Sequence, residues 1–150
     1  GLEAVDKALE LSPLNTNILN NKAIILGYLG RKEEAIETAE KLISLSPNHG
    51  NSYDTYGEIL IASGEYENAL EKLNKALSIE PTGWFAFETC LKIGKCYKQL
   101  GEYETAFEYY EKGKKLIEKM NPNERLDHLQ RAEKLISEIK VLMEKSNNSE

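Results

Sequence analysis

Apolar residues recur at spacings of three and four along most of the chain, and short polar breaks separate the runs. This spacing places the apolar residues on one face of an α-helix, so each run predicts an amphipathic helix. The predicted helices cover residues 2–11, 16–29, 32–45, 50–63, 66–79, 83–100, 103–119 and 122–145. Strand-like alternation is sparse, so the pattern indicates an all-α chain.

The breaks between these helices repeat along the sequence. Prolines end alternate helices at intervals of 34 residues: Pro13, Pro47 and Pro81. Glycines mark the middle of each unit: Gly30, Gly64 and Gly101. Glycine accepts the left-handed backbone that ends a helix, and proline disfavours helix in the residue before it. The step from Gly64 to Gly101 is 37 residues, which predicts a three-residue insertion before the third full unit.

Small residues stand where the two helices of each unit are expected to touch. They are Ala23, Gly57 and Gly94 in the first helices and Ala35, Ala69 and Ala106 in the second helices. A small side chain lets two helix axes approach closely. One helix pair cannot bury both of its faces, so neighbouring pairs are expected to stack.

Over residues 1–118, the period and these glycine, alanine and proline positions together resemble the tetratricopeptide repeat family. The resemblance implies an all-α, right-handed superhelical stack of helix–turn–helix repeats. We expect one array over residues 1–145, and Gly113 stands where the family has a small alanine. Its parts are a partial repeat (1–15), repeats at 16–49 and 50–83, a repeat with the insertion (84–120) and a C-terminal capping helix (121–145), before a disordered tail (146–150).

Composition narrows the function. The net charge of −6 argues against nucleic-acid binding, and the longest apolar runs are too short to cross a membrane. Cys90 and Cys96 are expected to be reduced packing thiols in a cytoplasmic protein. No phosphate loop, nucleophile elbow or paired-histidine motif is present, so we expect no enzyme activity, no cofactor and no metal site.

In the family, the first helices of the repeats line a concave groove, which implies a set of partner-binding residues. They are Asn17, Asn20, Asn21, Ile24 and Tyr28 in the first full repeat, Asn51, Asp54, Thr55 and Glu58 in the second, and Glu88, Leu91, Lys92, Lys95 and Lys98 in the third. Amides can donate to and accept from a peptide backbone, so the asparagines predict sequence-tolerant peptide binding. The alternative is that they are ordinary polar surface residues. Chaperone-binding members hold a terminal carboxylate at these columns, where only Lys92 fits, so we exclude that mode.

Trp84 lies in the inserted segment, where the three extra residues predict one additional helical turn. We expect Trp84 to share a face with Leu91 and to stand at the edge of the groove beside Lys92, Lys95 and Lys98. An aromatic anchor beside lysines suits a partner with an apolar side chain flanked by acidic residues. The alternative is that Trp84 packs back on the preceding helix.

Three functional hypotheses remain open from the sequence. The first is a scaffold that binds a peptide or partner protein in the groove. The second is a structural element that associates through exposed repeat ends. Residues 2–11 lack a first-helix partner, so the N-terminal end is expected to be a cut end that can form homo-oligomers. The third is a regulatory domain of a larger protein.

Overall fold

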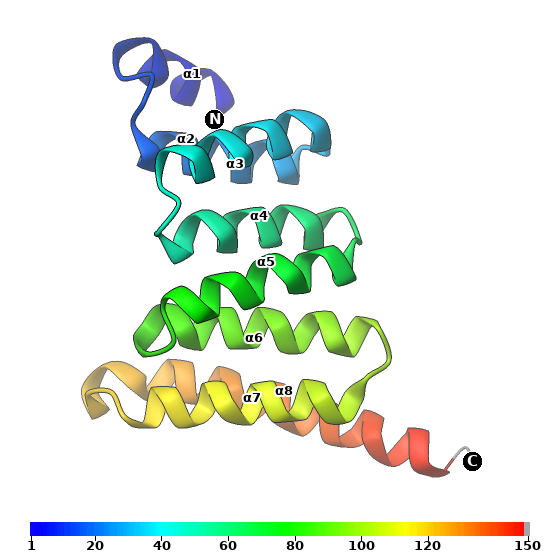
Figure 1. The fold of residues 1–150 in the computed structure, drawn as a ribbon. Helices are drawn as coiled ribbons and strands as arrows, with labels where there is room; N and C mark the ends of the chain where they lie inside the picture. Colours follow the sequence, from blue (N-terminus) through cyan, green and yellow to red (C-terminus); the bar gives the residue numbers. More distant parts are fainter. Residues whose placement is uncertain (149–150) are drawn as a thin grey trace. The chain divides into compact units, whose positions relative to one another are not determined.

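The computed structural model describes residues 1–148, which form eight helices and no strand (Figure 1). The helices are α1 (Leu2–Leu11), α2 (Thr16–Tyr28), α3 (Lys32–Leu45), α4 (Gly50–Ala62), α5 (Tyr66–Ile79), α6 (Gly83–Gln99), α7 (Tyr103–Glu118) and α8 (Pro122–Asn148). The all-α prediction is confirmed. Every predicted boundary lies within one residue of the observed one, except the end of α8.

Helix α8 continues through Asn148, whereas the sequence predicted its end at Lys145 and a disordered tail from Ser146. The prediction is wrong for residues 146–148, because adding a residue to an existing helix costs far less than starting one. Residues 149–150 of the predicted tail lie outside the described residues. The predicted start is confirmed, since Asn121 Oδ1 accepts a hydrogen bond from the Asn123 amide at 3.0 Å.

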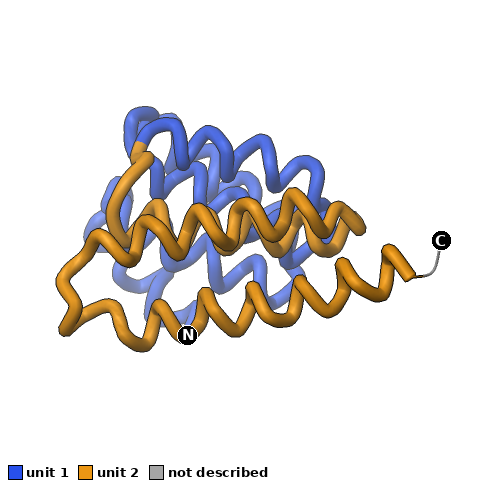
Figure 2. The backbone as a smooth tube through the Cα atoms, turned by 90° about the horizontal axis from the view of Figure 1, so that it is seen from below, with its two compact units in different colours: residues 1–79 blue, residues 80–150 orange. Residues whose placement is uncertain are grey.

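The chain divides into two compact units, residues 1–79 and residues 80–150 (Figure 2). Helices α1 to α5 belong to unit 1, and helices α6 to α8 belong to unit 2. The division falls close to the predicted boundary between the repeats at 50–83 and 84–120. The single array over residues 1–145 stays a prediction.

The turns inside the repeats have the glycine geometry that the sequence predicts. Gly30, Gly64 and Gly101 have φ angles of 79°, 76° and 80°. After each glycine, the next amide reaches back to a carbonyl of the last helical turn, as in the bond of 2.9 Å from Arg31 N to Leu26 O. This is the helix ending that satisfies carbonyls otherwise left without a partner.

The core of unit 1 is built where α2, α3 and α4 meet. One cluster of buried residues joins these helices: Ala23 and Leu26 from α2, Ala35 and Ala39 from α3, and Ile59 from α4. Between α4 and α5 the approach is closer still. A Cβ atom added to Gly57 would lie 2.7 Å from Cδ2 of Leu73, so the backbone of α4 lies directly against that side chain.

Unit 2 has its own core, shared by α6, α7 and α8. Its buried residues are Phe87, Leu91, Ala106, Tyr110, Ile117, Ala132, Ile136 and Ile139. The ring of Tyr110 on α7 lies directly over Gly94 on α6, in a space that a side chain at Gly94 would occupy. The buried residues of α8 recur at spacings of four and three, as predicted for a capping helix with one apolar face.

Candidate functional site

One stripe of α2 carries most of the residues predicted to bind a partner in unit 1. Asn17, Asn21, Ile24 and Tyr28 follow each other at spacings of four, three and four, so they share one face of the helix. Both asparagines are exposed, Ile24 is half-buried, and Tyr28 is 72% exposed. This stripe therefore presents amide groups, an aliphatic side chain and an aromatic ring to solvent.

Two side-chain hydrogen bonds join α2 to α4. Tyr28 Oη donates to Glu58 Oε1 at 3.0 Å, and the buried hydroxyl of Thr55 donates to Asn20 Oδ1. Asn20 is half-buried, and its amide oxygen already serves this contact. For Asn20 the structure therefore favours a helix-joining role. The sequence could not reveal it, because the partner lies 35 residues away.

Asn51 on α4 stands 34 residues after Asn17 and is exposed like it. Within residues 1–148, the side chains of Asn17, Asn21 and Asn51 make no hydrogen bond, so their amides face solvent. Asp54 was also predicted to contact a partner, but it is only 5% exposed. The prediction of an accessible Asp54 is wrong, because this part of α4 faces the protein interior and not solvent.

In unit 2, the insertion lengthens α6 to 17 residues, whereas α2 and α4 have 13 each. The predicted additional turn is therefore confirmed. It carries Trp84, which is 43% exposed and packs its ring against His128 of α8, with ring centroids 3.9 Å apart. Phe87 lies on the other side, at 6.0 Å between centroids. The packing alternative is the better description, but the ring packs on α8 and not on the preceding helix.

Leu91 is 1% exposed, so its predicted contact with a partner is wrong. It belongs to the core of unit 2, where its Cδ2 would lie 3.4 Å from a Cβ atom added to Gly113 on α7. Gly113 has no side chain, so Leu91 can fill that space. Apolar spacing alone did not show that α7 covers this side of α6.

Glu88, one turn after Trp84, forms a two-pronged ion pair with Arg131 of α8. The Nη1–Oε1 and Nη2–Oε2 distances are 2.6 and 3.1 Å. Burial raises the pKa of the Glu88 carboxyl, but the hydrogen bonds and charge of Arg131 outweigh it and lower the pKa overall. The Arg131 guanidinium also lies 5.8 Å from the ring centroid of Phe87. Sequence reasoning missed Arg131, because no local spacing links the two helices.

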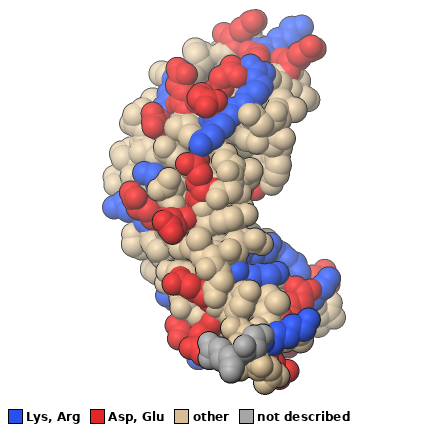
Figure 3. Space-filling model, turned by 90° about the vertical axis from the view of Figure 1, so that its right-hand side faces the viewer, with Lys and Arg blue, Asp and Glu red and all other residues tan. Residues whose placement is uncertain are grey.

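The predicted basic residues lie along α6 at spacings of three. Lys95 is exposed, and Lys92 and Lys98 are half-buried. Basic and acidic side chains lie in small mixed groups on the face drawn in Figure 3, separated by uncharged surface. The lysines of α6 are therefore a local feature of an otherwise mixed surface.

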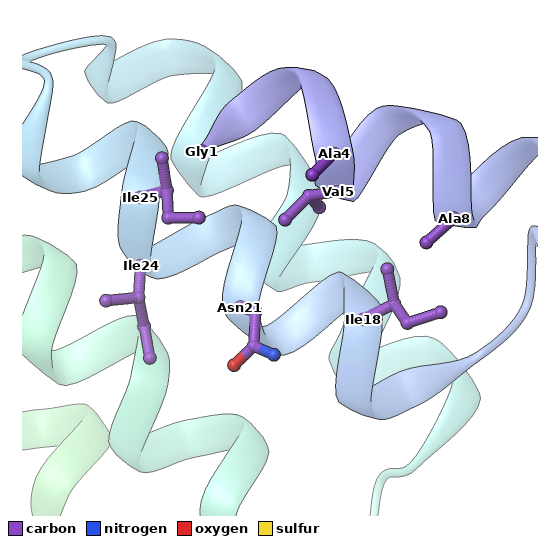
Figure 4. A pocket seen from close by; sticks show the side chains of 8 residues that line it. All are labelled: Gly1, Ala4, Val5, Ala8, Ile18, Asn21, Ile24 and Ile25. Atoms are coloured by element: carbon purple, nitrogen blue, oxygen red, sulfur yellow. The ribbon is translucent and has the colours of Figure 1, made fainter.

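A groove of about 410 Å³ opens between α1 and α2 (Figure 4). One wall is made of small residues of the N-terminal helix, and the other is made mostly of branched apolar residues. The lining residues are Gly1, Ala4, Val5 and Ala8 on the first side and Ile18, Asn21, Ile24 and Ile25 on α2. The sequence predicted an uncovered apolar side of α1, but not that α2 completes it as a groove.

The described residues offer little for covalent or metal chemistry. Burial raises the pKa of Cys90 and of Cys96 to about 11, so both thiols stay protonated near neutral pH. No group of three or more potential metal-binding side chains comes together within residues 1–148. In the same range, no helix has the length and apolar character needed to cross a membrane.

Comparison with solved structures shows where this fold is found. The type III secretion translocator chaperone SycD of Yersinia enterocolitica matches 93% of this chain and 88% of its own, with a TM-score of 0.72 and 19% identity. SycD in complex with a peptide of the translocator YopD matches 82% of this chain and 90% of its own, with a TM-score of 0.69 and 19% identity. The Sgt2 TPR domain of Aspergillus fumigatus matches 89% and 82%, with a TM-score of 0.72 and 20% identity.

No curated protein sequence matches the chain. Two family models do. The tetratricopeptide repeat model matches residues 16–49, the first full repeat predicted from the sequence. The model for regulator of microtubule dynamics protein 1-3 matches residues 55–140, more than half of the 150 residues. The chain is therefore a tetratricopeptide repeat protein that belongs to the regulator of microtubule dynamics protein 1-3 family.

Proposed function

We propose that this chain is a non-enzymatic scaffold that binds a peptide or a partner protein through the first helices of its repeats. The observation that carries the proposal is the pair Asn17 and Asn51. They occupy the same position in successive repeats, and both amides are exposed without a side-chain hydrogen bond within the described residues. Amides repeated at this interval suit an extended backbone, which offers donors and acceptors regardless of its sequence.

The relatives support the same class of function. The SycD structure contains a bound peptide, which shows that this fold can hold one. The family name indicates that the partner of this chain takes part in controlling microtubules. We therefore propose that the chain provides the partner-binding part of a regulator of microtubule dynamics. Tubulin is the first partner to test.

The test uses a displayed library of short peptides, selected on the intact chain, and measures the affinity of the selected peptides by calorimetry. The variant that changes both Asn17→Ala and Asn51→Ala should bind them roughly 30-fold more weakly, since each hydrogen bond contributes about 1 kcal/mol. The matched control changes Asn48→Ala and Asn74→Ala, both exposed outside this face. Equal affinity in the two double variants would contradict the proposal.

A second experiment asks whether tubulin is the partner. The chain would be sedimented with polymerised tubulin, and the growth rate of individual microtubules would be measured by fluorescence microscopy. We expect the chain to change the growth rate and the Asn17→Ala, Asn51→Ala variant to lose that effect. A selected peptide that binds well, together with no effect on microtubules, would keep the scaffold function and reject tubulin as partner.

Self-association through the repeat ends is the second candidate. Exposed leucines near the start of the chain favour it, since Leu11 is 87% and Leu14 is 64% exposed. Sedimentation over a hundredfold range of concentration distinguishes it from a scaffold that acts as a monomer. A mass that rises with concentration and falls back in the Leu11→Ser, Leu14→Ser variant would support self-association.

A further inference from the structure

The groove between α1 and α2 has an occupied counterpart one repeat further along the chain. A shift of 34 residues turns Gly1, Val5 and Ile25 of its lining into Ala35, Ala39 and Ile59. Those three residues form one buried cluster with two side chains of α2. The same surface is thus open between α1 and α2 and filled by a helix between α3 and α4.

The way α2 fills that second site defines the ligand chemistry. It contributes Ala23, and three positions later Leu26, to the cluster. Gly27 then brings the backbone close, since a Cβ atom there would lie 3.3 Å from Cγ1 of Ile59. A small residue followed three positions later by a large apolar one recurs as Gly57 with Leu60. This spacing keeps both on one face of a helix.

We propose that the groove between α1 and α2 binds an amphipathic helix of another polypeptide, which presents a small residue followed three positions later by a large apolar residue. This goes beyond the proposed function, because the ligand is helical, not extended, and one wall of the site belongs to α1. The small residues Ala4 and Ala8 leave room for a helix to approach, and Ile18 and Ile25 provide the apolar contact.

A second folded copy of this chain is not the ligand. In the described residues, the small residues that would have to enter the groove are already covered by neighbouring helices. Ala23 and Ala132 are 0% exposed, and Gly57 and Gly94 are also buried. A copy would have to unfold to offer one of these faces. The helix must therefore come from a different polypeptide.

The probe is a synthetic peptide with the sequence of residues 15–31, which carries the required pattern in α2. Calorimetry with the intact chain should give saturable binding of one peptide. Ala4→Arg places a charge in the groove at an exposed residue and should weaken binding at least ~10-fold. Asn74→Arg, an equal charge change at an exposed residue of α5, should leave binding unchanged. A peptide that carries aspartate at the position of Leu26 should not bind.

A second measurement needs no variant of the chain. In methyl NMR spectra, the peptide should shift the signals of Ile18 and Ile25 and leave those of Ile136 and Ile139 in place. Absence of saturable binding, or equal binding by the Ala4→Arg protein, would overturn the proposal. The latter would mean that the peptide displaces α2 from the site between α3 and α4. A mass that doubles with concentration, and does not double in Ala4→Arg, would overturn it in favour of a second copy.

The Asn17→Ala, Asn51→Ala variant separates this site from the proposed extended-peptide site. Neither residue lines the groove between α1 and α2, so this variant should bind the helical peptide as the parent does. Loss of helix binding with library peptides still bound would reject the groove alone.

Discussion

Replacing Gly57 with alanine tests the closest helix contact described in unit 1. The new Cβ would lie 2.7 Å from both Cγ and Cδ2 of Leu73 and 3.5 Å from the carbonyl oxygen of Ala69. Leu73 is 0% exposed, so its side chain has no open space to move into. Overpacking of this kind costs about 1–3 kcal/mol. Alanine gains about 1 kcal/mol over glycine in helix propensity. We therefore expect Gly57→Ala to lower the free energy of unfolding by about 1 kcal/mol.

Gly113→Ala is the matched control, because it is also a buried glycine within a helix. A Cβ atom there would lie no closer than 3.4 Å to its neighbours, which is ordinary contact. Only the gain in helix propensity remains, so this variant should be more stable by about 0.5–1 kcal/mol. The two substitutions are chemically identical, yet the structure predicts opposite signs.

Urea unfolding followed by far-ultraviolet circular dichroism measures both free energies, and thermal melts should shift by about 2–4 °C per kcal/mol. A third comparison introduces Gly57→Ala into a Leu73→Ala background. There the obstructing side chain is gone, so alanine at position 57 should stabilise. If Gly57→Ala stabilises the parent as much as Gly113→Ala does, the close approach of α4 and α5 is refuted.

Three further predictions concern other contacts. Ala69→Leu, at a fully buried helix contact, should cost roughly 1–3 kcal/mol in urea unfolding, whereas the exposed His49→Ala should change almost nothing. The lowered pKa of Glu88 means that its ionised form stabilises the fold. The stability difference between the parent and Glu88→Gln should be present above the ordinary pKa of about 4.3 and vanish as the pH falls below it. Cys90 and Cys96, with pKa values of about 11, should resist iodoacetamide at pH 8 until urea unfolds the chain; rapid labelling of the folded protein would show that burial is overstated.

The sequence was sufficient for features that repeat or that act over a few residues. The left-handed Gly30 and the N-cap Asn121 follow from local backbone chemistry, and both are observed. Asn17 and Asn51 could be paired in advance because one repeat length separates them. In each case the relevant neighbour lies nearby in the sequence or at a fixed interval from it.

Contacts between helices of different repeats could not be predicted in the same way. Leu91 was expected on the surface, but its position over Gly113 depends on how α6 and α7 pack. The ring contact of Trp84 and His128 depends on how α8 lies on the additional turn of α6. Hydrophobic spacing reports which side of a helix is apolar, but not which other helix covers it.

The additional turn of α6 limits how this repeat protein can be rebuilt. Arrays of identical repeats can be lengthened by inserting another copy, because each junction is like the last. Here α8 meets a residue of that turn through His128 and meets Glu88 through Arg131. A 34-residue repeat inserted between α7 and α8 would give α8 a new neighbour without those side chains. The last three helices should therefore be inherited, transplanted and redesigned as one block.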